Sequence, residues 1–192
     1  NNNNNNNNNN RRQTLLFSAT WGERVEQLSK SIQYLPTIVS DSQSQSNTTT
    51  SAAHVDRSLL QQSALLFSGT QQTRLQALSH ILATSTIAHN NSSCIIFCET
   101  RSQCNHVADF LRSRGASALP LHGDLEQRDR QKTLIRFRNK SCRILVATNV
   151  ASRGLDVEGV GLVVCFQLNQ EVDVHVHRVG RTARADSLGE AV

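Results

Sequence analysis

Three arginines near the end of the chain are spaced so that they could act together on phosphate. Within the run HRVGRTAR, Arg178, Arg181 and Arg184 recur at every third position. Residues three apart share a helix face, so these side chains should project together and repel one another unless an anion faces them. Arginines at a sheet edge are typical of the fingers that stabilise charge in phosphoryl transfer. A solvated basic surface is the alternative, although Gly180 weakens a helix that serves solubility alone.

Other residues suited to phosphate follow short apolar runs earlier in the chain. They are mainly glycines, hydroxyl and amide side chains and arginines, which let a backbone approach an anion, donate hydrogen bonds to it or neutralise its charge. The group comprises Glu99, Thr100, Arg101, His122, Gly123, Asp124, Gln127, Arg130, Arg153, Gly154 and Asp156. Together they predict a site for a polyphosphate or a nucleic-acid backbone.

Alternating strands and helices must position these residues. Apolar runs predict strands at 63–68, 94–98, 116–121, 142–148 and 161–166, and amphipathic stretches predict helices at 74–82, around 107–111, at 126–138 and at 173–180. The side chains expected to face inward from these helices are Val107, Phe110, Leu111, Leu134, Ile135 and Phe137, and Gly115 should end the second helix. The alternation predicts an α/β fold, a parallel sheet with helices on both faces. Functional residues of such folds lie at the carboxyl ends of the strands.

The first 56 residues have a different character. Ten asparagines open the chain, and 40–53 read SDSQSQSNTTTSAA, which cannot build a core. Between them, a strand is expected at Leu15–Phe17 and a helix up to Pro36. So short a piece should be the tail of a domain whose body is missing. We therefore expect a low-complexity run at 1–10, the end of one domain at 11–39, a polar linker at 40–56 and a second domain at 57–192.

Composition excludes several classes of protein. No apolar run reaches the roughly 20 residues that a membrane helix needs, and no signal peptide opens the chain, which predicts an intracellular protein. Five cysteines, an odd number among apolar residues, argue against a disulfide framework. Cys94 and Cys98 lack a second pair, so no metal site is expected. His175 and His177 could be a ligand pair, but without acidic or cysteine partners they favour surface or inter-lobe contacts.

The positive charge is concentrated in one part of the chain. The net charge is +5, and 17 of the 20 basic residues are arginine. Residues 101–153 hold nine arginines and two lysines against four acids, a local +7, whereas residues 154–192 hold three arginines against six acids. Arginine favours bidentate recognition of phosphate, so a polyphosphate or nucleic-acid partner is one hypothesis for the basic segment, and a solvated basic face is the alternative that charge alone leaves open.

The motifs together resemble the DEAD-box RNA helicases. In that family's order and at its separations stand SAT at 18–20, CIIFCET at 94–100, HGD at 122–124 with Gln127 and Arg130, ATNVASRGLD at 147–156 and HRVGRTAR at 177–184. One such motif is weak, but five in register over about 170 residues are specific. Trp21 after SAT, the run LHGDLEQRDRQKTLIRF and the ending HVHRVGRTARA resemble the bacterial-type DbpA group, whose members act in large-subunit ribosome assembly.

The resemblance implies two RecA-like lobes with ATP in the cleft between them and RNA bound across both. This chain would be the second lobe with a remnant of the first. Asp156 would meet the ATP ribose, Arg181 and Arg184 would reach the γ-phosphate, and His177 and Arg178 would join the inter-lobe network around the nucleotide. The residues that would grip RNA are Gly123, Gln127, Arg130, Thr148, Arg153 and Gly154. Ser18, Ala19 and Thr20 would couple nucleotide state to closure of the lobes.

Departures from the family pattern also carry expectations. Asn149 stands where an acid is usual, and Ala183 stands where glycine is commoner, which should have little effect. The sequence contains no GxxxxGK[ST] loop and no DEAD box, so we expect a fragment that cannot hydrolyse ATP alone. Mg²⁺ would be held by the first lobe. A monomer in the cytoplasm, nucleus or nucleolus, acting on ribosomal RNA, is the corresponding expectation.

Two other functions remain open from the sequence. A non-catalytic RNA-binding or regulatory module could have kept this lobe alone, although it would have no reason to retain Asp156, Arg181 and Arg184. A scaffold that binds only proteins fits the basic segment poorly.

Overall fold

The computed structural model describes residues 14–16, 23–32, 37, 59–66, 69–85, 92–149, 160–168, 172–183 and 187–192. The chain forms two compact units, Asn1–Ala53 and His54–Val192. The first holds helix α1 (Glu23–Ile32), whose Glu26 and Lys30 pair at 2.7 Å one turn apart. This confirms a helix before Pro36. Residues 14–16 form no strand, and the rest of the strand expected there lies outside the described residues.

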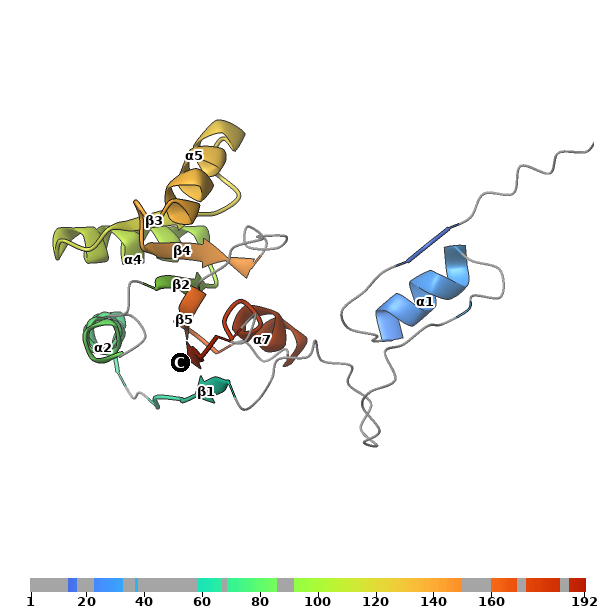
Figure 1. Ribbon diagram of the computed structural model, residues 1–192, viewed down its shortest axis with the longest axis horizontal. Coiled ribbons are helices and arrows are strands. Elements are labelled where there is room, and N and C mark those ends of the chain that lie inside the picture. The colour runs from blue at the N-terminus through green and yellow to red at the C-terminus, as the bar shows by residue number, and fades with distance from the viewer. Residues whose placement is uncertain are drawn as a thin grey trace, which may run out of the picture. The chain divides into compact units, whose positions relative to one another are not determined.

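The second unit contains a six-stranded parallel sheet (Figure 1). Its strands are β1 (Leu60–Gln62), β2 (Ser93–Cys98), β3 (Ala118–Leu121), β4 (Ile144–Thr148), β5 (Val160–Cys165) and β6 (Gly189–Ala191), in the order β1-β6-β5-β2-β4-β3. Every neighbouring pair is parallel. The central strands β2, β4 and β5 are almost wholly buried because both faces of the sheet are covered, which explains their near-continuous apolar sequences.

Helices cover both faces of this sheet, as the alternation of elements predicts. The helices are α2 (Gln71–Thr84), α4 (Arg101–Ser113), α5 (Gln127–Arg138) and α7 (Val172–Val179). Residues of α2 and α4 pack with Cys94, Ile96 and Cys98 in one core. Residues of α5 and α7 pack with Ile95 and Phe97 in the other. Successive side chains of β2 thus enter opposite cores, as the period of a strand requires.

Two local expectations about the helices have different outcomes. Gly115 follows α4 with a φ of +82°, in the left-handed region where glycine ends helices, which confirms the predicted stop. Ile135 was expected to face inward from α5, but its side chain is 55% exposed. Phe137 and Thr133 are the buried residues of this helix. The expectation for Ile135 was wrong because the rotation of α5 on the sheet places Thr133 inward instead.

The strand predicted at 63–68 is wrong for residues 63–66, and residues 67–68 lie outside the described residues. The strand at this edge is β1, and residues 63–66 follow it without regular structure. Leu65 is 52% exposed and Leu66 is 99% exposed. The reason is pairing: β1 lies beside β6, with Leu60 opposite Gly189 and Gln62 opposite Ala191. Ser63 N–H still donates to Ala191 O at 2.9 Å, and the ladder ends there among the described residues.

In the parts of the chain that the structure describes, no helix has the length and apolar character to cross a membrane.

Candidate functional site

The register of the sheet brings the predicted site segments to one edge. Thr148 at the end of β4 lies opposite Cys98 at the end of β2, and Leu121 at the end of β3 lies opposite Ala147. On the other side of β2, Phe97 lies opposite Cys165 of β5. The segments that follow β2, β3, β4 and β5 therefore leave the same edge of the sheet. This is the edge at which the sequence predicted the functional residues.

The turn after β3 is held by contacts to α4. His122 is 3% exposed, and its Nε2 lies 2.9 Å from Oδ1 of Asn105. Asp124 forms an ion pair with Arg101, the first residue of α4. Gly123 between them is exposed, and a Cβ added to it would find its nearest neighbour, the Arg101 Nε, at 4.0 Å. The backbone at Gly123 is therefore open to close approach by a phosphate.

The other described candidates for RNA contact begin α5 or end β4. Gln127 is exposed at the first position of α5, and Arg130 is half-buried one turn later. Arg130 N–H donates to Glu126 O at 3.0 Å, within the first turn of the helix. Thr148 is 8% exposed, so its side chain faces the interior. Arg153 and Gly154 lie outside the described residues. Contact with RNA stays a prediction for all six candidates, which are Gly123, Gln127, Arg130, Thr148, Arg153 and Gly154.

The three spaced arginines do not lie on one helix face. Helix α7 ends at Val179, and Arg181 belongs to the turn that follows, with its N–H donating to Arg178 O at 3.1 Å. Arg178 is 2% exposed, whereas Arg181 is half-buried. The expectation of a shared face was wrong for this pair because the helix ends between them. Arg184 lies outside the described residues.

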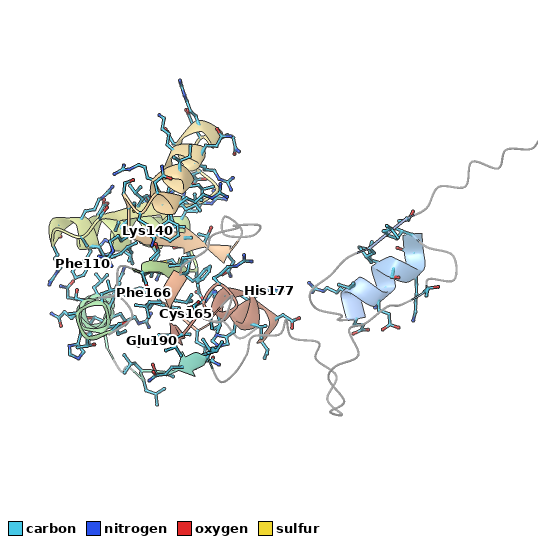
Figure 2. The ribbon with its side chains drawn as sticks, viewed as in Figure 1. Phe110, Lys140, Cys165, Phe166, His177 and Glu190 are labelled. Carbon is cyan, nitrogen blue, oxygen red and sulfur yellow. The ribbon has the colours of Figure 1, made fainter. Side chains whose placement is uncertain are left out.

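Arg178 lies among the ends of three strands. Its Nε donates to Oδ1 of Asn149 at 2.7 Å, and its Nη1 donates to the carbonyl oxygen of Gln167 at 2.9 Å. The guanidinium carbon lies 5.5 Å from the centre of the Phe97 ring. Its Nη2 is buried and has no hydrogen-bond partner among the described residues. His177, next to it on α7, is exposed (Figure 2).

The turn that carries Arg181 is packed against β5 and β6. Thr182 is fully buried beside the backbone of β5. Ala183 has a φ of +53°, in the left-handed region. A Cβ on Gly189 of β6 would meet Ala183 N and Thr182 Oγ1 at 2.4 Å. The position of Arg181 is therefore determined by close packing of its neighbours, which no local pattern predicted.

Sequence reasoning singled out Thr100 but missed two glutamines, Gln103 and Gln167, that help to organise this edge. The N-cap hydroxyl of Thr100 accepts from Gln103 N–H at 3.1 Å, and Gln103 Oε1 accepts from Glu99 N–H at 3.1 Å. Gln103 Nε2 donates to Gln167 Oε1 at 2.9 Å, which joins the first turn of α4 to the segment after β5. Gln103 and Gln167 are 64 positions apart, so the sequence carries no signal for this contact. Ser18, Ala19, Thr20 and Asp156, the remaining predicted site residues, lie outside the described residues.

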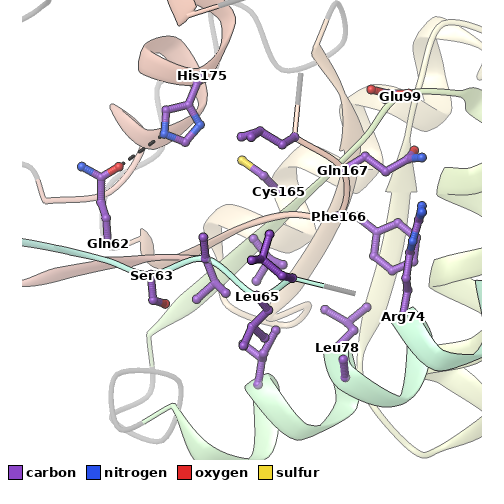
Figure 3. A pocket seen from close by; sticks show the side chains of 17 residues that line it. Gln62, Ser63, Leu65, Arg74, Leu78, Glu99, Cys165, Phe166, Gln167 and His175 are labelled. Atoms are coloured by element: carbon purple, nitrogen blue, oxygen red, sulfur yellow. Dashed lines mark hydrogen bonds between the residues drawn. The ribbon is translucent and has the colours of Figure 1, made fainter. Parts of the chain in front are cut away.

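A pocket of about 670 Å³ lies between α2, residues 62–66 and the end of β5 (Figure 3). Its lining is mainly apolar, with Leu65, Leu78 and Phe166 prominent, and Arg74 and Glu99 are among its polar residues. His175 also lines it, and its Nε2 lies 3.3 Å from Gln62 Oε1. Burial, followed by the nearby Arg178 guanidinium, lowers the pKa of His175 below 6.5. His175 is therefore neutral near pH 7.

The two cysteines of β2 are core side chains. Cys94 is 3% exposed, and burial raises its pKa. Cys98 and Cys104 share a hydrogen bond between their thiols, which raises the pKa of Cys98. All five cysteines are free. In the described ranges, no group of three His, Cys, Asp or Glu side chains is placed to hold a metal ion.

Comparisons with known proteins agree with this arrangement. Residues 73–186 match the helicase conserved C-terminal domain. The ATP-dependent RNA helicase DbpA of Escherichia coli is 43% identical over 180 residues, which are 94% of this chain and 36% of that protein. The ATP-dependent rRNA helicase RRP3 of Phaeosphaeria nodorum is 41% identical over 179 residues, which are 93% of this chain and 30% of that protein.

A solved structure shows the same fold. Dbp5 of S. cerevisiae, bound to RNA and ADP BeF3, aligns with a TM-score of 0.70 and 28% identity over 92% of this chain and 43% of that one. The chain spans about a third of the length of the curated relatives that it matches. The chain therefore belongs to the helicase conserved C-terminal domain family, as a DbpA-like second lobe of the DEAD-box RNA helicase type.

Proposed function

We propose that this chain is the second lobe of an ATP-dependent RNA helicase, which couples ATP binding and hydrolysis to unwinding or remodelling of RNA. The observation that carries the proposal is the match to the helicase conserved C-terminal domain, together with the carboxyl edge of the sheet, where the segments after β2, β3 and β4 emerge and Arg178 bonds to Asn149 and Gln167. The names of the relatives DbpA and RRP3, an RNA helicase and an rRNA helicase, support ribosomal RNA as the substrate and ribosome maturation as the process.

RNA would bind through its backbone at the ends of β3 and β4 and the start of α5. The residues proposed to contact it are Gly123, Gln127, Arg130, Thr148, Arg153 and Gly154. Segment 101–153 has a local charge of +7, which favours phosphate contacts that weaken as salt rises. The chain has one Trp, one Tyr and six Phe, of which Phe97, Phe137 and Phe166 are buried, so few rings are available for stacking on bases. Binding should therefore depend little on RNA sequence.

ATP would be bound by Asp156, after β4, and by Arg181 and Arg184. Asp156 would accept from the ribose hydroxyls, and Arg181 and Arg184 would stabilise charge on the transferring phosphoryl group. His177 and Arg178 would belong to the network that joins the two lobes, and Ser18, Ala19 and Thr20 would couple nucleotide state to closure. Mg²⁺ would be held by the first lobe. We further propose an intracellular monomer that acts in the cytoplasm, nucleus or nucleolus.

The decisive experiment joins this chain to a complete first lobe, taken from Escherichia coli DbpA, and measures ATP hydrolysis with and without RNA. RNA-stimulated hydrolysis is expected because both halves of the ATP site are then present. In the joined protein, Arg181→Ala should lower kcat by about 10³-fold or more while RNA affinity is retained. RNA binding without hydrolysis would instead support the non-catalytic module, and an unchanged kcat in Arg181→Ala would overturn the role of this arginine.

RNA contact by α5 has its own test with a matched control. Arg130→Ala should weaken binding alike for RNAs of different sequence and reduce the dependence of log affinity on log salt by about one unit. Arg138→Ala removes the same charge eight positions later, about 12 Å along the helix at its far end. Arg138 is exposed, and its replacement should change affinity by less than about twofold. Equal losses in the two variants would show a diffuse charge effect instead of a site.

A further inference from the structure

Arg178 is a buried cation without a carboxylate partner among the described residues. Its side chain is 2% exposed, and the described ion pairs, Glu26–Lys30, Arg101–Asp124, Asp109–Arg112 and Asp129–Lys132, all involve other residues. Burying a charge is costly unless nearby groups compensate it. Here the compensation comes from neutral groups: the Asn149 amide, the Gln167 carbonyl, the Cys165 thiol and the face of Phe97.

These contacts join three parts of the candidate site. Asn149 begins the segment that follows β4 and leads to Arg153, Gly154 and Asp156. Gln167 follows β5, and Arg178 itself lies on α7, just before the turn that carries Arg181. The Arg178 side chain therefore joins Asn149 at the end of β4 and Gln167 after β5 to helix α7. Since Nε and Nη1 are both engaged and the group is buried, the side chain is placed to hold these segments and not to bind phosphate itself.

Asn149 accepts from only one of the two N–H groups, on Nε and Nη2, that the Arg178 guanidinium presents on the same side. Nε–H and one Nη2–H point in the same direction, and a carboxylate can accept from both at once. Asn149 has one carbonyl oxygen, which accepts from Nε at 2.7 Å. Its other terminal atom is an NH₂ group, which donates and cannot accept. This accounts for the buried Nη2 that has no hydrogen-bond partner among the described residues.

We propose that Arg178 is a positioning residue that holds Asn149, at the end of β4, against Gln167 after β5 and against α7, and that the side chain at position 149 sets how firmly it does so. The functional part of the proposal rests on the helicase function proposed above. An aspartate at position 149 would accept from both Nε and Nη2, and it would place a negative charge beside a cation that is already buried. The Arg178–Asn149 contact is therefore weaker than the contact that an aspartate at position 149 would make.

The first experiment does not depend on any activity. Thermal unfolding of the 192-residue chain is compared with that of Asn149→Asp, Asn149→Ala, Arg178→Gln and the double variant Asn149→Asp/Arg178→Gln. Asn149→Asp should raise the unfolding midpoint by about 3–8 °C. In the Arg178→Gln background the same change should lower the midpoint, because the carboxylate then lacks its cation. Gln131→Glu makes the same amide-to-carboxylate change at an exposed position of α5 and should shift the midpoint by less than about 1 °C.

The second experiment separates positioning from direct contact with the nucleotide. In the joined two-lobe protein, kcat and KM for ATP are measured for Asn149→Ala, Arg178→Gln and both together. Positioning through Asn149 predicts that the double variant loses no more kcat than the worse single variant, and that Asn149→Asp keeps kcat at the parent level or above it. If the kcat losses of the two single variants multiply in the double variant, Arg178 acts on the nucleotide directly and the proposal is overturned. An unchanged or lower unfolding midpoint for Asn149→Asp would also overturn it. If the joined protein hydrolyses no ATP, the helicase proposal fails while the unfolding experiment still decides whether the Arg178–Asn149 contact exists.

Discussion

The hydroxyl oxygen of Thr182 lies 2.7 Å from the carbonyl oxygen of Val160 and is fully buried. The same hydroxyl lies 3.0 Å from the carbonyl oxygen of Gly161. Thr182 directly follows Arg181, so this contact ties the turn that carries the proposed arginine finger to the first residues of β5.

Replacing Thr182 by Val keeps the shape of the side chain and removes its hydroxyl. The buried carbonyl oxygens of Val160 and Gly161 then lose a donor, and we expect the free energy of unfolding to fall by about 1–3 kcal/mol. Urea unfolding of the 192-residue chain measures this loss. Thr84→Val is the control, because Thr84 donates to His80 O at 2.9 Å from an exposed position where water replaces the lost partner. Equal losses in the two variants would show that burial of Thr182 does not matter.

Gly189→Ala should be strongly destabilising. The added Cβ would lie 2.4 Å from the backbone nitrogen of Ala183, so β6 or the turn must move, at a cost of about 3 kcal/mol or more. Gly123→Ala is the comparison for stability, since nothing lies closer than 4.0 Å to its Cβ, and it should leave the unfolding free energy nearly unchanged. Circular dichroism during thermal unfolding compares the two. A tolerated Gly189→Ala would contradict the close packing of this turn on β6.

Ala183→Gly should stabilise the chain. The φ of +53° at Ala183 lies in the left-handed region, where a Cβ costs about 1 kcal/mol that glycine does not incur. The expected gain in unfolding free energy is about 0.5–1 kcal/mol. Ala77→Gly, within helix α2, makes the same chemical change in helical backbone and should lower stability by about 1 kcal/mol. Opposite signs for the two variants are the result to look for. The expectation that alanine at 183 has little effect on function stays untested.

Protonation of His175 should destabilise the fold. Its pKa in the folded protein lies below 6.5, so the unfolded chain binds this proton more readily. Well above pH 6.5 His175 therefore does not lower the free energy of unfolding. This free energy falls as pH decreases from 6.5 through the lower pKa of the folded state. His175→Gln should remove part of this pH dependence in urea unfolding between pH 5 and 7.5. Parallel profiles for the parent and His175→Gln would contradict burial as the cause.

Much of the fold follows from local patterns in the sequence. The runs at 94–98, 142–148 and 161–166 became β2, β4 and β5, and the alternation with amphipathic stretches predicted a parallel sheet covered on both faces. Strand and helix periods are properties of the local backbone, so a single segment carries enough information to reveal them. Because parallel strands end at a common edge, the sequence also predicted where the functional residues meet.

The apolar segment at 63–68 shows where local information fails. Leu65 and Leu66 have the composition of a strand, yet a strand exists only where a partner offers backbone groups. That partner, β6, is about 130 positions away in the chain. In the same way, the rotation of α5 that exposes Ile135 is decided by packing against the sheet.

The sequence alone determined which residue types gather at the carboxyl edge and the phosphate chemistry that they suit. Only the tertiary structure decided what each does there. Arg178 and Arg181 are alike in type and spacing, but the end of α7 between them leaves Arg181 half-buried in a turn and buries Arg178 against Asn149, Gln167 and Phe97. The reason is that burial and hydrogen bonding depend on neighbours brought close by the fold, and those neighbours are 11 and 29 positions away for the two hydrogen bonds of Arg178.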